Sequence, residues 1–248
     1  MPRCGLHLTS FRHPGHEDGR LFERTVDLTE ALERSATFET LWLADHMHDL
    51  GPGGATAPMP ESYVLLAALA ARTRRLRLGV LATSVTYRPP ALLAKMITTL
   101  DVISGGRAIL GIGAGHPRTE GEQRAYGIEF PPIGERMDRL EEALQIIRGM
   151  FREDTTSFDG RHYHVQSARN FPRPVQPVGP RILVAGSGER RLLRLVARYA
   201  DMCNLSFPSG DHLAGLPRKL EVLARHCEAL TGLMTLTDSP RAAAGATS

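Results

Sequence analysis

Short apolar runs alternate with longer amphipathic segments along most of the chain. Runs rich in Leu, Ile and Val, such as TLWLAD at 40–45 and RILVAG at 181–186, are typical of buried strands. In 134–151 the apolar residues instead recur at helical spacing. The pattern predicts strands at 3–8, 40–45, 77–85, 107–113, 181–186 and 202–206, and helices at 21–37, 60–73, 90–103, 134–151, 189–200 and 217–230.

This alternation of strands and helices predicts an α/β fold built on a parallel sheet covered on both faces. By itself it does not distinguish a closed barrel from an open sheet. One segment, 152–180, interrupts the pattern. Within it, Asp159-Gly160 has the form of a tight hairpin turn, and the proline-rich stretch 171–180 cannot be helical. We expect this excursion to form a wall or lid beside a site.

Composition and length limit the class of protein. With 248 residues the chain can form one large domain, which we place at 1–236, followed by a disordered tail at 237–248. The formal charge of +3 is small and the arginines are spread out, which argues against a nucleic-acid partner. The cysteines Cys4, Cys203 and Cys227 are widely separated, as is usual for reduced thiols. Neither a signal peptide nor a bilayer-spanning segment is evident, so we expect a soluble, cytoplasmic protein.

The strongest candidate for chemistry is the pair Asp45-His46, where the strand at 40–45 ends. In parallel α/β proteins, ligands bind at the carboxyl ends of strands. An imidazole suits general acid–base catalysis there, because an unperturbed histidine side chain has a pKa of about 6.5. Two alternatives remain. One is a surface turn, and the other is a metal pair formed by His46 and His48, for which no further ligand of suitable spacing follows. We therefore predict no metal.

Two glycine-rich segments follow other predicted strands. GIGAG at 111–115 is not a dinucleotide-binding fingerprint, because His116 stands where the third glycine would be. A tight strand-to-loop turn is equally compatible with it. Gly186, Ser187 and Gly188 precede a predicted helix, whose first amides and dipole suit a phosphate group. We expect Gly186→Val to weaken binding of a phosphate-bearing cofactor and to leave the fold intact.

Five segments together resemble the luciferase-like monooxygenase superfamily. They are LWLADHMHDL at 41–50, the segment 78–115 that ends in GIGAG, the segment 122–147 that begins EQRAYG, SFDGRHYHV at 157–165, and the segment 186–205 that begins GSGERR. More narrowly, they resemble the branch that uses coenzyme F-420, an 8-hydroxy-5-deazaflavin. The resemblance implies a TIM-type (β/α)8 barrel, with the deazaflavin across its carboxyl-terminal mouth and hydride transfer at the C5 atom of the deazaflavin.

The resemblance also implies a set of site residues. Asp45 and His46 match the catalytic acid–histidine pair beside the redox ring. The segment 80–83 matches one that backs the ring, often through a non-proline cis peptide. The predicted cofactor-binding residues are Asp45, His46, Leu81, Ala82, Thr83, Gly113, Ala114, Gly115, His116, Gly186, Ser187 and Gly188.

The chain departs from the family pattern in three places. The loop HPRTEG at 116–121 is longer than usual, and the first helix lacks the glycine that normally separates it from the next strand. The seventh and eighth βα units are not visible, although LMTLT at 233–237 could begin a seventh strand. We therefore expect an incomplete barrel of about six to seven strands, whose open edges are covered in a homodimer.

The predicted function is hydride transfer between a small organic substrate and coenzyme F-420 bound at the barrel mouth, with His46 exchanging the proton. One alternative is a reduced-FMN-dependent monooxygenase or a flavin reductase. An alternative of another class is a catalytically silent flavin-binding or dimerisation protein. The substrate is not specified, because specificity depends on variable loops.

Overall fold

The computed structural model describes residues 4–12, 18–51, 54, 56–205 and 215–237, and its centre is one curled parallel sheet. Its strands lie in the order β1 (Cys4–Leu8), β2 (Phe38–Leu43), β3 (Arg77–Val80), β5 (Ala108–Gly113), β8 (Arg181–Ala185) and β9 (Met202–Asn204). A two-residue strand, β4 (Thr83–Ser84), pairs with β5 beyond the end of β3. The predicted strands are confirmed, except that the one expected at 77–85 divides into β3 and β4.

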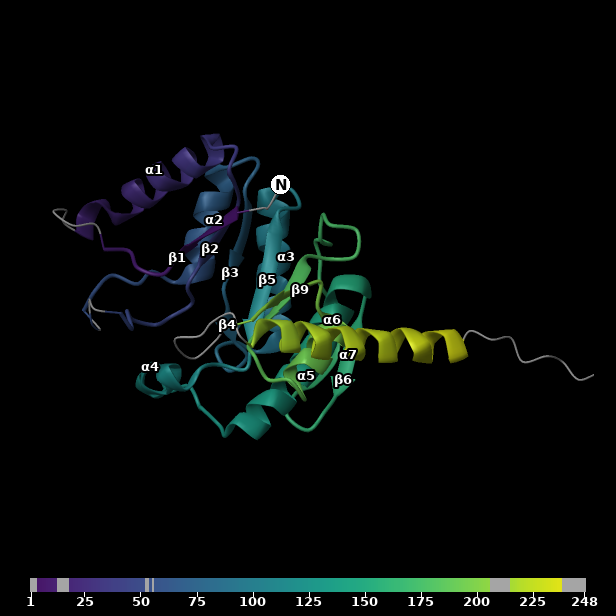
Figure 1. Ribbon diagram of the computed structural model, residues 1–248. Helices are drawn as coiled ribbons and strands as arrows, with labels where there is room; N and C mark the ends of the chain where they lie inside the picture. The colour runs from purple at the N-terminus through teal and green to yellow at the C-terminus, as the bar shows by residue number, and fades with distance from the viewer. Residues whose placement is uncertain (1–3, 13–17, 52–53, 55, 206–214, 238–248) are drawn as a thin grey trace, which may run out of the picture.

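The main helices connect successive strands and pack beside one another. They are α1 (Leu21–Arg34), α2 (Ser62–Arg72), α3 (Pro90–Ser104), α5 (Ile133–Arg152), α6 (Leu192–Tyr199) and α7 (Leu216–Thr237). Each contacts the next one in this series, so the helical layer follows the order of the sheet (Figure 1). The predicted helices are confirmed. The short helices η1 (Asp18–Arg20), η2 (Pro117–Thr119) and α4 (Glu120–Ala125) were not predicted.

The alternating residues of each strand divide the core into two parts. Leu41 and Leu43 of β2 are fully buried in the large cluster between the sheet and the helices. Trp42, between them, belongs to a small cluster with Ile109 and Leu183. This division follows from the two-residue period of a strand. The small cluster fills the inner side of the curl.

Two glycines of the strands are needed because neighbouring groups lie very close to them. A Cβ atom on Gly79 would lie 2.6 Å from Cζ3 of Trp42. On Gly111 it would lie 2.0 Å from the carbonyl oxygen of Val80. Gly111, the first residue of the GIGAG segment, therefore serves close packing between strands. The last residues of the segment follow the end of β5 and reach the mouth of the sheet.

The sheet is open, with β1 and β9 at its two ends, so the expected incomplete barrel is confirmed. The suggestion of a seventh strand at 233–237 is wrong, because these residues continue α7. A helix that has begun adds one hydrogen bond for each further residue, whereas a new strand would need a partner edge. None of the helices formed by the described residues has the length and hydropathy needed to cross a membrane.

The excursion at 152–180 forms the predicted hairpin, with β6 (Thr156–Asp159) antiparallel to β7 (His164–Ala168), but the strands are joined by residues 160–163 and not by a tight turn at Asp159-Gly160. The carboxylate of Glu142 on α5 accepts the backbone N–H groups of Arg161, His162 and Tyr163, and so fixes the turn to that helix. The residues that line the cavities described below do not include any from this segment. Our expectation of a disordered tail at 237–248 is wrong for Thr237, which ends α7, and otherwise falls on residues outside the described ones.

Candidate functional site

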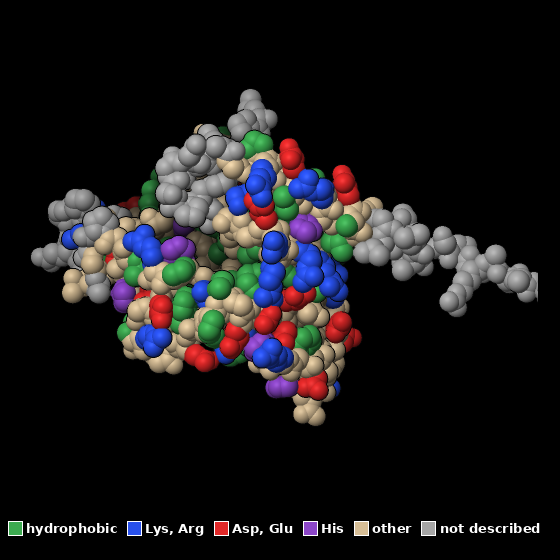
Figure 2. Space-filling model, turned by 60° about the horizontal axis from the view of Figure 1, so that its bottom comes forward, with side chains coloured by type: hydrophobic (Ala, Val, Ile, Leu, Met, Phe, Trp, Pro, Cys, Tyr) green, Lys and Arg blue, Asp and Glu red, His purple; other side chains and the backbone are tan. Residues whose placement is uncertain are grey.

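One cavity of about 1050 Å³ lies at the carboxyl ends of the strands, and all twelve residues predicted to bind the cofactor line it. Figure 2 shows the hollow on this face of the molecule. A smaller cavity of about 630 Å³ adjoins it. The two share five lining residues, which are His7, His46, Leu81, His116 and Thr119. The structure therefore brings together the ends of β1, β2, β3, β5 and β8, as expected for a site at the mouth of a barrel.

The back of the larger cavity is formed where β3 gives way to β4. The peptide bond between Leu81 and Ala82 is cis, so the non-proline cis peptide expected in 80–83 is confirmed. The N–H group of Leu81 donates to the carbonyl oxygen of Leu43, which keeps this turn joined to β2. Leu81 and Ala82 give this part of the lining an apolar character, and Ile133 and Met137 of α5 add apolar side chains to the lining.

Asp45 is held in a buried ion pair at the strand exit. Its carboxylate accepts from both terminal nitrogens of Arg88, at 2.6 and 3.1 Å. Arg88 also donates to Thr83 at 3.0 Å and lies over the ring of Tyr63. Burial opposes the charge of Arg88, but its bonds to Asp45 outweigh burial and raise the pKa of the guanidinium. These contacts indicate a structural role for Asp45, and its predicted catalytic role stays a prediction.

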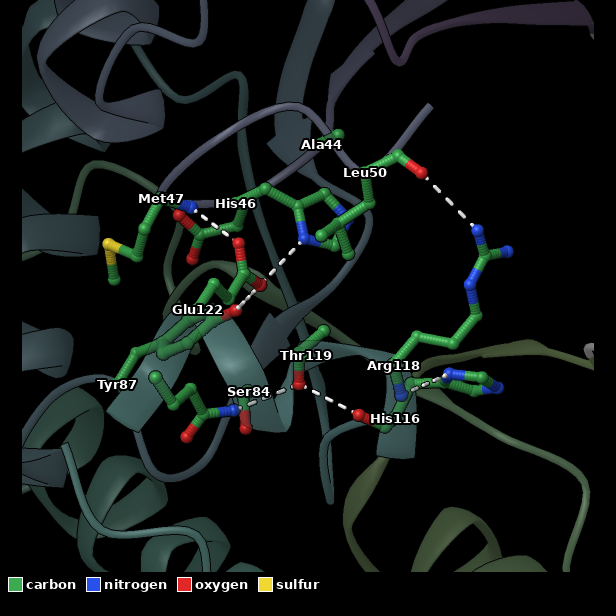
Figure 3. Close-up of polar contacts among 12 residues, drawn as sticks. Ala44, His46, Met47, Leu50, Ser84, Tyr87, His116, Arg118, Thr119 and Glu122 are labelled. Atoms are coloured by element: carbon green, nitrogen blue, oxygen red, sulfur yellow. Dashed lines mark hydrogen bonds and ion pairs between the residues drawn. The ribbon is translucent and has the colours of Figure 1, made fainter. Parts of the chain in front are cut away.

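His46 is held by a carboxylate that the sequence analysis did not identify. Its Nδ1 atom lies 2.9 Å from Oε1 of Glu122, on α4 (Figure 3). Oε1 also accepts the hydroxyl of Tyr87 at 2.5 Å, and Oε2 accepts the N–H group of Met47 at 2.8 Å. The side chain of Glu122 is fully buried, whereas that of His46 is 28% exposed. Glu122, His46 and Tyr87 thus form one hydrogen-bonded cluster at the cavity.

The same contacts explain the ionisation of this cluster. Burial opposes ionisation of Glu122, but the bonds from His46, Tyr87 and Met47 outweigh it, so the pKa of the Glu122 carboxyl lies below its ordinary value. Burial, and then the bond to Glu122, raises the pKa of the Tyr87 hydroxyl. Glu122 is therefore a carboxylate and Tyr87 a neutral donor near neutral pH.

Helix α4 is fixed at the cavity by a second set of polar contacts. Gln123, fully buried, accepts from the hydroxyl of Thr86 at 2.6 Å and donates to that of Thr119 at 2.9 Å. Thr119 in turn donates to the carbonyl oxygen of His116 at 2.8 Å. The longer loop at 116–121 therefore becomes an ordered turn that places Glu122 beside His46. EQRAYG, already singled out in the sequence, contains this carboxylate.

His7 on β1 is a second imidazole at the cavity that the sequence analysis missed. Partial burial, and then the nearby His46, lowers the pKa of the His7 side chain, although much of it remains exposed. Among the described residues no group of three or more His, Cys, Asp or Glu side chains is placed to hold a metal ion. The Nδ1 atom of His46, which a metal pair with His48 could have used, is bound to Glu122.

The glycine loop after β8 lies at the other end of the cavity. Lys219 of α7 donates to the carbonyl oxygen of Ser187 at 2.7 Å, and its side chain lines the cavity. Helix α6 begins only at Leu192, after a turn at 189–191, and not directly after Gly188 as predicted. The loop therefore combines bare backbone with a lysine side chain.

The structure also corrects our expectation for Gly186→Val. Gly186 has a φ of 139°, and a Cβ atom there would lie 3.0 Å from Cδ1 of Leu192. A valine would therefore disturb the fold as well as the cavity. Gly188 is better suited to this test, because a Cβ atom there meets its nearest heavy atom, Cβ of Leu192, at 3.6 Å.

Comparison with known proteins places this site in a family. The model of the luciferase-like monooxygenase family matches residues 4–233. A protein of Intrasporangium calvum named F-420-dependent glucose-6-phosphate dehydrogenase is 35% identical over 176 residues, which are 71% of this chain and 50% of that protein. The chain thus spans about half the length of this curated relative.

Two solved structures share the fold. A monooxygenase from Streptomyces bottropensis is 26% identical with a TM-score of 0.75, over 93% of this chain and 67% of that one. The oxygenating constituent of 3,6-diketocamphane monooxygenase from Pseudomonas putida, in complex with FMN, has a TM-score of 0.70 at 21% identity, over 92% of this chain and 62% of that one. The second likeness concerns the fold alone.

Proposed function

This chain belongs to the luciferase-like monooxygenase family, and we propose that it is an oxidoreductase that transfers a hydride between a small organic substrate and coenzyme F-420. The observation that carries the proposal is the cavity at the strand ends, where an imidazole bound to a carboxylate faces the same space as a glycine loop. The relative from Intrasporangium calvum, named for its dependence on F-420, supports this choice of cofactor. We also propose that the protein is located in the cytoplasm.

The lining of the cavity fits an elongated cofactor with a flat ring and an anionic group. Leu81, Ala82, Ile133 and Met137 offer an apolar surface of the kind that a ring system needs. The exits of β2 and β8 are three strand spacings apart, on the order of 14 Å. At the β8 end, Lys219 and the backbone around Gly188 suit a phosphate group. We therefore assign the ring to the end with His46 and the phosphate to the end with Gly188.

When bound in this arrangement, a deazaflavin would supply the hydride acceptor or donor. His46 holds the proton: it accepts one from a substrate hydroxyl as hydride leaves the adjacent carbon, and it returns the proton in the reverse direction. Leu81 and Ala82 would support the ring system and exclude water from it. Asp45 and Arg88 fix the strand exit on which His46 stands.

A reduced-FMN-dependent monooxygenase is the second candidate function. The likeness to the Streptomyces monooxygenase supports it, at higher identity than the likeness to the FMN complex. FMN also carries a ring and a phosphate, so the same cavity would suit it. A direct comparison of the two cofactors separates the candidates.

We expect coenzyme F-420 to bind more tightly than FMN, and Gly188→Val to weaken binding of F-420. The valine would keep the phosphate from the backbone N–H groups of the loop, and the loss of one hydrogen bond to a charged group costs about 1.5–3 kcal/mol, roughly a 10- to 150-fold change in Kd. Titration followed by fluorescence gives the Kd of each cofactor for the unmodified protein and for the variant. Circular dichroism verifies that the variant is folded. Gly19→Val is the control, because a Cβ atom there meets no neighbour. Tighter binding of FMN would replace the first candidate with the second, and binding of neither would favour a silent protein.

We also propose that the protein is a homodimer. β1 and β9 end the sheet, and three of the five residues of β1 are exposed, so its edge is available to pair with another chain. Sedimentation equilibrium should give about twice the mass of one chain at micromolar concentration. A single-chain mass over the whole concentration range would reject this proposal.

A further inference from the structure

We propose that Glu122 is a positioning residue that fixes the tautomer of His46, so that Nδ1 carries the proton and Nε2 presents its lone pair to the cavity. The inference rests on the proposed function, because it specifies which atom of His46 exchanges the proton. It concerns a residue on α4 that is 76 positions away in the sequence.

The hydrogen bonds around Glu122 determine where the protons are. An ionised carboxylate has no proton to give, so every partner of its oxygens must be a donor. Oε2 takes the backbone N–H group of Met47, and Oε1 takes the hydroxyl of Tyr87. Nδ1 of His46 lies 2.9 Å from the same Oε1 and must therefore carry a hydrogen. Full burial of Glu122 makes these bonds more effective than the same bonds in water.

The other ring nitrogen is left for the substrate. Nε2 stands on the opposite edge of the imidazole, and His46 lines both cavities. Among the described residues, Nε2 of His46 makes no hydrogen bond, whereas Nδ1 is fully engaged. A neutral imidazole in this state is a base at Nε2 alone.

Replacement of Glu122 by glutamine should reverse this tautomer. The N–H group of Met47 requires an acceptor, so the amide oxygen of the glutamine would take the place of Oε2. The NH₂ group would then face Nδ1 of His46 and donate to it, which moves the ring proton to Nε2. In the serine protease triad, the corresponding change from carboxylate to amide produces the wrong tautomer and lowers kcat by about 10⁴. We expect a loss in turnover of about 10²–10⁴-fold here, without a comparable loss in cofactor affinity.

The tautomer can be observed directly in the protein without cofactor. Two-bond ¹H–¹⁵N spectra of histidine-labelled protein, recorded well above the ordinary pKa of imidazole, distinguish Nδ1–H from Nε2–H. His46→Ala identifies the signal. His164 provides a reference within the chain, because its Nδ1 lies 2.6 Å from the carboxylate of Asp159 but both side chains are largely exposed. We therefore expect a fixed Nδ1–H form for His46 and a mixture for His164.

Tyr87→Phe provides a second variant in case Glu122→Gln does not fold. It removes one donor to Oε1 and leaves Glu122 charged, so His46 should keep the Nδ1–H form. An Nε2–H form of His46 in the unmodified protein, an unchanged tautomer in folded Glu122→Gln, or a change in Tyr87→Phe would each overturn the inference. Reversal of the tautomer together with unchanged turnover would uphold the assignment to Glu122. It would then be the proposed acid–base role of His46 that fails.

Discussion

His46→Ala should lower turnover of hydride transfer by about 10²–10⁴-fold, the usual contribution of a general acid or base. The affinity for the cofactor should fall much less. The imidazole reaches the cavity with one nitrogen bound to Glu122 and the other unbonded among the described residues, an arrangement that serves proton exchange. Stopped-flow reduction of the bound cofactor, at saturating cofactor and across pH, gives the two quantities separately.

His116→Ala is the matched control for this experiment. His116 also lines both cavities, but it is exposed, and its Nδ1 accepts only the backbone N–H group of Arg118 at 3.2 Å. With no carboxylate to orient it, we expect turnover at saturating cofactor to change little, whereas cofactor affinity should fall, because His116 is one of the residues predicted to bind the cofactor. If His46 only packs against the ring, His46→Ala would instead weaken cofactor binding and leave turnover near normal at saturation.

The position of the site could be predicted from the sequence because strand ends are marked locally. The apolar run of β2 stops at Asp45-His46, and that of β5 stops at GIGAG, so chemistry and bare backbone appear at known places in the alternation. Parallel strands bring their carboxyl ends to one edge of the sheet, independently of the conformations of the loops. The same local pattern predicted the hairpin around Asp159-Gly160.

Other features depended on contacts between distant segments and could not be predicted in this way. Glu122 has the pattern of an ordinary charged residue in a polar loop until α4 forms and buries it against His46. Asp45 and His46 are adjacent in sequence, but Asp45 is paired with Arg88 and only His46 is paired with Glu122, and neither partner could be identified from local sequence. The sequence also gave no indication that Gly111 is needed because Val80 approaches it.

The structural role of Asp45 leads to the second large effect, which is on stability. Arg88→Met should lower the free energy of unfolding by about 3–5 kcal/mol, because it leaves the carboxylate of Asp45 buried without its partner. Only 3% of the Asp45 side chain and 11% of the Arg88 side chain are exposed, so water cannot replace the lost contacts. Urea unfolding followed by circular dichroism measures this change. Arg72→Met, which removes a largely exposed pair with Glu30, should cost about 0–1 kcal/mol.

Removal of both charges distinguishes a structural from a catalytic Asp45. In the double variant Asp45→Leu with Arg88→Met, no buried charge remains unpaired, because Glu61, which also loses its ion pair with Arg88, is 42% exposed. Much of the lost stability should therefore return. Asp45→Asn should likewise keep most of the turnover per bound cofactor, because the proton moves through His46 and Asp45 acts only on the strand exit. A loss of about 10²-fold or more in turnover for folded Asp45→Asn would restore the catalytic role that the sequence first suggested. Asp45, which precedes His46 in the sequence, would then contribute to the chemistry together with Glu122, the carboxylate that contacts His46 in the structure.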